Sequence, residues 1–294
     1  MKRKSTKQVA WENSMNLLFF LCGIITVGFV LCISVYLVIS GIPAIAEIGI
    51  GDFFLGKVWK PTATTVEPSY GILPFLLTSI YGTAGAVVLG IPVGLLTAVY
   101  LAKLAPPKIA AVIRTAVQLL AGIPSVVYGL VGMIVLVPGV QKLFGLSSGA
   151  TLFTAILVLA VMILPSIINV SETALRAVPK DYEDASLALG ATELETYFRV
   201  SVPAAKSGIA TAIVLGVGRA IGEAMAIIIV SGNVPNMPCL FESVRFMTTA
   251  IASEMSYAPV GSLQRQALFS IGLVLFLFIM LINVLLNLFV KREG

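Results

Sequence analysis

Residues 72–101 read ILPFLLTSIYGTAGAVVLGIPVGLLTAVYL, a run of thirty residues without a single charged side chain. An α-helix needs about 20 such residues to cross the roughly 30 Å hydrocarbon core of a bilayer. A straight helix of this length would extend about 45 Å, so we expect it to tilt, or to bend where Gly90 and Pro92 weaken its hydrogen-bond ladder. This stretch predicts a membrane-spanning helix.

Further apolar runs of similar character lie on both sides of this one. Hydrophobic residues make up 58% of the 294 residues and charged residues only 11%, against roughly 25% charged in a soluble domain. The sequence therefore predicts an all-α integral membrane protein with six transmembrane helices. We divide it into residues 1–70, which hold the N-terminus, the first helix and an outer loop, and a core at 71–294. The other five predicted spans cover about 17–40, 109–137, 150–170, 207–231 and 268–290.

The distribution of basic residues predicts the orientation in the membrane. If the first span stays uncleaved and the N-terminus is inside, one face holds thirteen Lys and Arg residues and the other holds five. Cytoplasmic loops carry the excess of Lys and Arg, so both termini and the connection at 171–206 are expected in the cytoplasm. The net charge of +5 then reflects topology, and we expect no nucleic-acid partner.

Several kinds of chemistry lack their usual residues in this sequence. There is no His, which removes the common zinc ligand and general base, and the three Cys show no C-x-x-C spacing. Residues 51–58 fit G-x-x-x-x-G-K but lack the Ser or Thr that would bind magnesium. We therefore expect no metal site, no cofactor bound by this chain and no enzyme activity of its own. Any ATP hydrolysis would need a separate partner.

The predicted cytoplasmic connection contains two helix starts. Asp181, with Asp184 three residues later, fits a capping box, and Gly190 is placed to end the helix in a left-handed cap. Thr192 begins a second capping box, completed by Glu195. The pattern predicts a helix-turn-helix elbow, which on these signals alone could be a simple connector on the membrane surface.

The predicted fifth span carries two charges in the sequence Gly218-Arg219-Ala220-Ile221-Gly222-Glu223. On a continuous helix Arg219 and Glu223 would share one face, and insertion scales put an Arg at mid-bilayer at about 2.5–3.5 kcal/mol, so the pair should face protein or water. Either the two charges neutralise each other and lock two helices, or Arg219 offers N–H donors to a passing anion. Gly218 and Gly222 would let another helix approach closely.

A second polar feature interrupts the predicted third span. Pro124 removes one amide donor from the helix, and Ser125 follows it directly. The Ser125 hydroxyl could repair the helix by satisfying a freed carbonyl, or it could line a pathway for a polar solute. In the outer loop, apolar residues between 244 and 255 recur at helical spacing, which fits either a docking platform or a plug that contacts only neighbouring spans.

The elbow resembles the E-A-A loop of ABC importer permeases, whose pattern is E-A-A-x3-G-x9-I-x-L-P. Here Asp replaces Glu, Ser replaces the second Ala, and Val replaces both Ile and Leu. The resemblance implies the type I importer (MetI-like) permease fold, with the elbow inserted into a cleft on the ATP-hydrolysing subunit. The residues that it implies for this coupling are Glu183, Asp184, Ala185, Ser186 and Gly190.

Four stretches are similar to the C-type permease subunits of phosphate-specific ABC importers (PstC). They are the segments 218–226, 121–129, 54–61 and 250–254. The resemblance implies a permease that translocates inorganic phosphate across the cytoplasmic membrane of a prokaryote, with Arg219, Glu223 and Ser125 as candidates for the substrate pathway. It also implies an A-type permease, two copies of a cytoplasmic ATPase that use ATP and Mg, and an extracytoplasmic phosphate-binding protein as partners. Molybdate, sulfate or phosphonate are alternative substrates, and an ion-coupled secondary transporter is the alternative outside this class.

Overall fold

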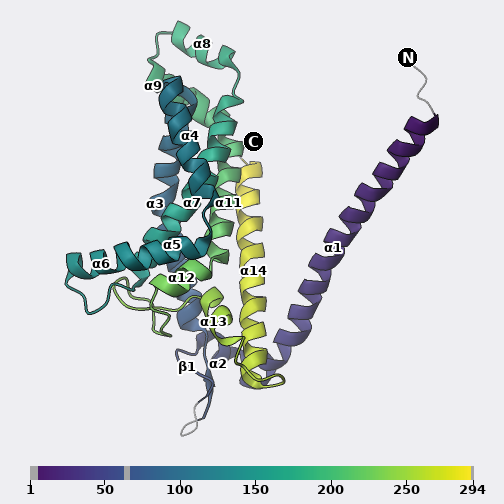
Figure 1. The fold of residues 1–294 in the computed structure, drawn as a ribbon, viewed down its shortest axis with the longest axis vertical. Helices are drawn as coiled ribbons and strands as arrows, with labels where there is room; N and C mark the ends of the chain where they lie inside the picture. Colours follow the sequence, from purple (N-terminus) through teal and green to yellow (C-terminus); the bar gives the residue numbers. More distant parts are fainter. Residues whose placement is uncertain (1–5, 63–66, 293–294) are drawn as a thin grey trace.

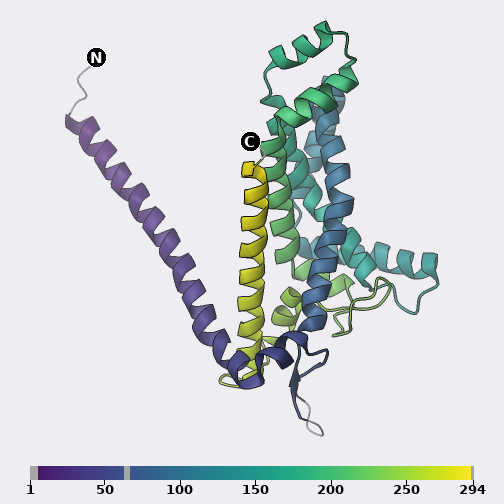
Figure 2. The ribbon, with the colours of Figure 1, turned by 180° about the vertical axis from the view of Figure 1, so that it is seen from behind.

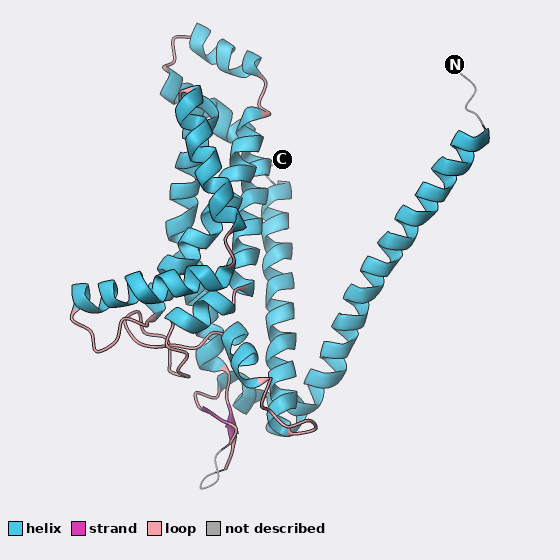
Figure 3. Cartoon of the chain, viewed as in Figure 1, coloured by secondary structure: helices cyan, strands magenta, loops and turns pink. Residues whose placement is uncertain are grey.

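The computed structural model describes residues 6–62 and 67–292 and is built almost entirely of helices (Figure 3). A short hairpin of β1 (Trp59–Lys60) and β2 (Ser69–Tyr70) lies at one end of the molecule, and the elbow helix α8 (Lys180–Ala188) lies at the other (Figure 1). The start of α1 and the end of α14 lie toward the same end as α8 (Figure 1).

Within the described residues, five helices are long and apolar enough to cross a membrane, or six if one bent pair counts as a single span. Four of the five belong to α1 (Thr6–Ile48), α3 (Leu73–Val99), α7 (Leu152–Arg176) and α14 (Leu263–Arg292), and the fifth is the helical run Ser125–Phe144. The bent pair joins Glu193–Ala204 to α11 (Lys206–Gly222) at an angle of 72°. The shorter helices are α2 (Ile50–Leu55), α4 (Pro107–Gly122), α5 (Ser125–Val131), α6 (Val137–Phe144), α9 (Glu193–Thr196), α10 (Val202–Ala204), α12 (Met225–Val230) and α13 (Met247–Glu254). Three π-helical segments continue neighbouring helices: η1 (Tyr100–Leu104), η2 (Gly132–Leu136) and η3 (Tyr197–Ser201).

The centre of the bundle is the contact between α3 and α7. A Cβ atom on Gly90 would lie 2.7 Å from Cδ1 of Ile163, and one on Gly94 would lie 2.7 Å from Cγ2 of Ile167. Glycine at these two positions therefore lets the branched side chains of α7 seat directly on the backbone of α3, as small residues do in membrane bundles. Helix α3 continues as one helix through Pro92, and its regular α geometry ends only at the π-helical turn η1.

The predicted third span is interrupted at Pro124, as its sequence indicates, but the bounds 109–137 are wrong because the candidate span begins after the break, at Ser125–Phe144. Helix α4 ends at Gly122, and Ile123 takes an extended conformation with φ −71° and ψ 128°. The ring of Pro124 disfavours the helical conformation of the residue before it, which explains the break. Beyond it, α5 and α6 run across the direction of α3 and α7 rather than along it (Figure 1).

The predicted fifth span is also broken, although no proline lies near the break. Helix α11 ends at Gly222, Glu223 is extended with φ −73° and ψ 129°, and the chain resumes helical geometry in α12. The short helices beyond the two breaks pack together, and a Cβ on Gly129 of α5 would lie 2.9 Å from Cα of Ala226 in α12. The two discontinuities thus belong to one region of the bundle.

Helix α1 diverges from the rest of the chain along most of its length (Figures 1 and 2). It meets α14 near its far end, where the Ser270 hydroxyl donates to the Gly41 carbonyl at 2.6 Å and the rings of Tyr36 and Phe269 pack edge to face. Most of its described apolar side chains before residue 40 are exposed. The basic residues at 2–4 used for the orientation lie outside the described residues.

Candidate functional site

Glu223 sits in the break between α11 and α12 and is held from two sides. One carboxylate oxygen accepts the backbone N–H of Ala226 at 3.0 Å, so the side chain caps the first turn of α12. The hydroxyl of Thr248, in α13, donates to the backbone carbonyl of Glu223 at 2.7 Å. These contacts account for a break that occurs without proline. They also mean that Arg219 and Glu223 do not share a helical face as expected, because the helix ends between them.

Arg219 is half-buried in the last turn of α11. Over residues 6–62 and 67–292 its guanidinium has no hydrogen-bond or ion-pair partner, and it interacts electrostatically with Tyr128 of α5. A Cβ added to Gly218 or Gly222 would meet no described atom within 4 Å. The close helix contact expected at these two glycines is therefore not made among the described residues, and the face of α11 that carries them is open.

The freed backbone at the first break is satisfied by a tyrosine. The hydroxyl of Tyr128 donates to the carbonyl of Leu120 at 2.7 Å, across the bend at Pro124. The Ser125 side chain is half-buried and makes no hydrogen bond with any described residue. Of the two roles considered for Ser125, the repair of the helix thus belongs to Tyr128 in this structure.

A pair of substitutions separates these two side chains. Tyr128→Phe removes the donor to Leu120, and we expect the free energy of unfolding to fall by about 1 kcal/mol, the usual net contribution of one hydrogen bond. Ser125→Ala, its control, should change stability by less than about 0.5 kcal/mol. Thermal unfolding of the purified protein in detergent measures both, and a larger loss for Ser125→Ala would contradict this assignment.

The elbow confirms two of the three capping signals. Gly190 has φ 88°, and the N–H groups of Ala191 and Gly190 donate to the carbonyls of Ser186 and Leu187, which is a Schellman motif. The Thr192 hydroxyl accepts a hydrogen bond from the backbone N–H of Glu195 at 3.3 Å. The backbone N–H of Thr192 donates in return to the carboxylate of Glu195 at 3.1 Å. These bonds from the Thr192 backbone and hydroxyl lower the pKa of the Glu195 carboxyl below its usual range.

The third capping signal, at Asp181, is wrong. Pro179 occupies the N-cap of α8 without a side-chain hydrogen bond, and the helix starts at Lys180, which places Asp181 inside its first turn. Proline already holds the φ value that precedes a helical turn, so the helix begins earlier than the polar pattern indicates.

The coupling residues implied by the resemblance divide between two sides of α8. Asp184, Ala185 and Gly190 are exposed. Ser186 is half-buried and its hydroxyl lies 2.9 Å from that of Thr196, whereas Glu183 turns toward the bundle. Large apolar side chains also face outward from this end of the molecule, namely Tyr182, Leu187, Leu189 and Leu194.

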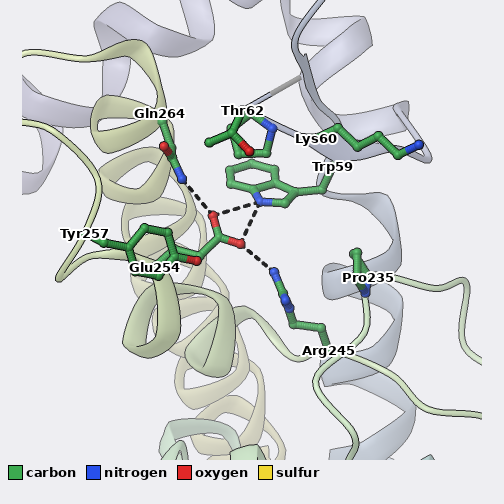
Figure 4. A pocket seen from close by; sticks show the side chains of 9 residues that line it. Trp59, Lys60, Thr62, Pro235, Arg245, Glu254, Tyr257 and Gln264 are labelled. Atoms are coloured by element: carbon green, nitrogen blue, oxygen red, sulfur yellow. Dashed lines mark hydrogen bonds and ion pairs between the residues drawn. The ribbon is translucent and has the colours of Figure 1, made fainter. Parts of the chain in front are cut away.

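At the opposite end, a pocket of about 340 Å³ surrounds the carboxylate of Glu254 (Figure 4). The indole N–H of Trp59 donates to both carboxylate oxygens at 3.1 Å, Gln264 donates at 3.1 Å, and Arg245 forms an ion pair. We call these four side chains the outer clamp. Sequence reasoning noted the stretches around Trp59 and Glu254 separately, but no local signal joined residues 195 positions apart.

The outer clamp explains why α13 is not a surface helix. Val244, Met247 and Ala250 are fully buried, and α13 packs against α14, α12 and α3. The Met247 N–H also donates to the Ser79 hydroxyl of α3 at 3.0 Å. This packing favours the plug over the docking platform.

Near the elbow, a second buried carboxylate organises three segments. Glu172 of α7 accepts from Arg114 of α4 at 2.7 Å and from Arg176 at 2.9 Å, and both guanidinium groups also donate to the Leu101 carbonyl in η1. The four-residue spacing of Glu172 and Arg176 is a recognisable helical signal that the analysis of the sequence did not use. Among the described residues, no group of three His, Cys, Asp or Glu could hold a metal ion.

A family model of the binding-protein-dependent transport system inner membrane component matches residues 90–293. The chain belongs to this family. Binding-protein-dependent permeases of ABC importers are integral proteins of the inner membrane, and the predicted all-α fold class is confirmed. The predicted membership of the PstC-like permeases is confirmed by the relatives.

Among the relatives of this permease, a probable ABC transporter permease protein, YqgH, of Bacillus subtilis is 37% identical over 90% of this chain and 87% of that protein. The phosphate transport system permease protein PstC of Haemophilus influenzae is 36% identical over 88% of this chain and 87% of that protein. A solved inward-facing MetNI methionine ABC transporter matches with a TM-score of 0.60 at 19% identity, over 76% of this chain and 96% of that one. These similarities agree in placing the chain among ABC importer permeases.

Proposed function

We propose that this chain is the C-type permease subunit of an ATP-driven importer of inorganic phosphate. The observation that carries the proposal is Arg219, a half-buried cation in the fifth span with no carboxylate partner among the described residues and with open space at Gly218 and Gly222. A planar guanidinium can bind two oxygens of a phosphate with two parallel N–H donors. Relatives that carry the name phosphate transport system permease support phosphate as the anion.

Two further residues shape this candidate pathway. Glu223 brings a negative charge to the break, so a phosphate dianion near Arg219 is repelled from one side and does not become trapped. Ser125 stands at the other break with a free hydroxyl for a passing anion. Transport needs binding that is strong enough for entry and weak enough for exit, so much of the selectivity would reside in the protein that delivers the substrate.

The partners follow from the same proposal. An A-type permease would pair with this chain, and an extracytoplasmic phosphate-binding protein would deliver the anion to the end that carries the hairpin. The complex would hold two copies of a cytoplasmic ATPase that use ATP and Mg, and one copy would dock on the elbow of this chain through Asp184, Ala185 and the apolar side chains beside them. Helix α8, the start of α1 and the end of α14 lie toward the same end of the molecule (Figure 1). This arrangement fits a cytoplasmic location of both termini.

Uptake competition tests the substrate directly. The complex is copurified with its partner subunits, reconstituted in vesicles with ATP inside, and supplied with labelled phosphate and the delivering protein outside. We expect unlabelled phosphate to suppress uptake at least tenfold more strongly than equal concentrations of sulfate, molybdate or phosphonate. Preferential competition by another oxyanion would reject phosphate as the substrate, and uptake by the isolated chain without nucleotide would indicate a secondary transporter.

A further inference from the structure

Glu183 joins the elbow to two membrane spans. Its carboxylate forms an ion pair with Lys103 and accepts a hydrogen bond from the Ser201 hydroxyl at 2.8 Å. The side chains of Lys103 and Glu183 are only 10% and 15% exposed, so this contact is shielded from water on all but one side. The three side chains come from three segments, and we call them the elbow joint.

Both partners of Glu183 lie in π-helical turns. Lys103 belongs to η1, which continues the second span beyond α3, and Ser201 belongs to η3, which leads through α10 into the fifth span. A π-helical turn widens the helix by one residue, redirects its side chains and is often found at functional sites. Two π-helical turns contact the carboxylate of Glu183. This indicates that the junction has a functional role in addition to packing.

The other contacts of α8 with the bundle are weak. None of its residues is buried, and it packs only against α9 and η3 among the more extensive contacts of the described residues. The Ser186–Thr196 contact ties α8 to α9 within the elbow itself. Apart from the chain connection at 177–179, which joins α8 to α7, Glu183 provides the side-chain contact of α8 with the second span.

The turn that carries Lys103 is itself anchored. The Leu101 carbonyl, two residues earlier, accepts from both Arg114 and Arg176, and these two guanidinium groups also grip Glu172. Helices α4 and α7 thereby hold η1 in place, so the ion pair has a fixed end at Lys103 and a movable end at Glu183. This arrangement suits the transfer of movement from α8 to the second span more than a bending of the elbow at this point.

We propose that Lys103 and Ser201 are positioning residues for energy coupling, because through Glu183 they transfer movement of the elbow to the second and fifth spans. The inference rests on the proposed docking of the elbow on an ATPase but not on which anion is carried. Helix α11 holds Arg219 and ends at the break at Glu223, so a displacement of η3 would reach the candidate pathway through α10 and the 72° bend that joins it to α11. Without the joint, the ATPase would move α8 while the spans stayed behind.

The test measures ATP hydrolysed per anion taken up by the assembled complex, relative to the wild type. Lys103→Met and Glu183→Gln should each raise this ratio at least tenfold, with ATP hydrolysis retained and uptake lost, and Ser201→Ala should raise it about threefold. The exchanged pair Lys103→Glu with Glu183→Lys should return the ratio to within threefold of the wild type. Lys108→Met, an exposed Lys five positions from Lys103, is the matched control and should leave the ratio unchanged.

Three results would overturn the inference. The first is an unchanged ratio in folded Glu183→Gln and Ser201→Ala complexes. The second is an exchanged pair that performs no better than the single variants. The third is loss of assembly, seen by copurification, with a normal ratio in the complexes that remain, because the joint would then be merely structural. ATP-dependent uptake by the wild-type complex is scored separately, so failure of the proposed function is distinguishable from failure of this inference.

Discussion

Arg219→Ala is expected to lower labelled-phosphate uptake by the assembled complex at least 100-fold, with little change in assembly. The variant removes the half-buried cation of the fifth span, and phosphate would then have to cross an apolar region without a charge partner. Arg219→Lys keeps the charge but loses the paired N–H donors, so we expect an intermediate loss of about tenfold. Uptake into reconstituted vesicles, measured beside the ATPase rate, gives both values.

The controls for Arg219 come from the same chain. Lys206→Ala removes an exposed cation at the start of the same helix and should leave uptake unchanged. Glu223→Gln keeps an oxygen that can accept the Ala226 N–H but removes the negative charge, and we expect uptake to fall about tenfold. If Arg219→Ala and Glu223→Gln both transport at the wild-type rate, the proposed pathway is rejected.

The second large effect is expected in the outer clamp, as a loss of stability. Glu254→Ala removes the ion-pair partner of the half-buried Arg245, which then keeps, among the described residues, only its hydrogen bonds to the Asn233 carbonyl. It also removes the acceptor of Trp59 and Gln264. Removing one partner of a buried ion pair costs about 3–5 kcal/mol, so the free energy of unfolding should fall by that amount. Thermal unfolding in detergent, or the denaturant midpoint of the purified subunit, provides the measurement.

Glu242 offers a matched control for the outer clamp, because it is an exposed glutamate in the same loop. Glu242→Ala should change stability by less than about 0.5 kcal/mol. A Glu254→Ala protein that unfolds within about 1 kcal/mol of the wild type would show that the clamp is not a major determinant of stability.

Local patterns predicted those parts of the structure that depend on near neighbours in the sequence. The apolar runs predicted the long helices, and the Gly190 and Thr192 caps were predicted because their hydrogen bonds close within five residues. The break at Pro124 also had a local cause. The direction that the chain takes after this break had no local cause and could not be predicted from the sequence. By contrast, no proline marks the break at Glu223, and Gly222 with Arg219 in the preceding turn is only a weak local signal that α11 ends there.

Contacts between distant segments were beyond the reach of one sequence. The break at Glu223 is held by Thr248, the outer clamp joins Trp59 to Glu254, and the elbow joint joins Lys103 to Glu183. Each of these contacts depends on how the helices pack against one another. The spacing of apolar residues in the sequence does not specify that packing. The candidate pathway residues themselves were recognisable because an unpaired cation in an apolar span is costly and therefore rare.

The divergence of α1 has a consequence for how its sequence can vary. The large apolar side chains between Leu17 and Ile33 are exposed, so their size and shape are set mainly by what surrounds the helix. Gly41, in contrast, admits no side chain without displacing the backbone of Ser270, since a Cβ there would lie 3.1 Å from its Cα atom. The helix is thus held against α14 around residues 36–41, and its earlier part can match its surroundings, whether these are acyl chains or a neighbouring subunit.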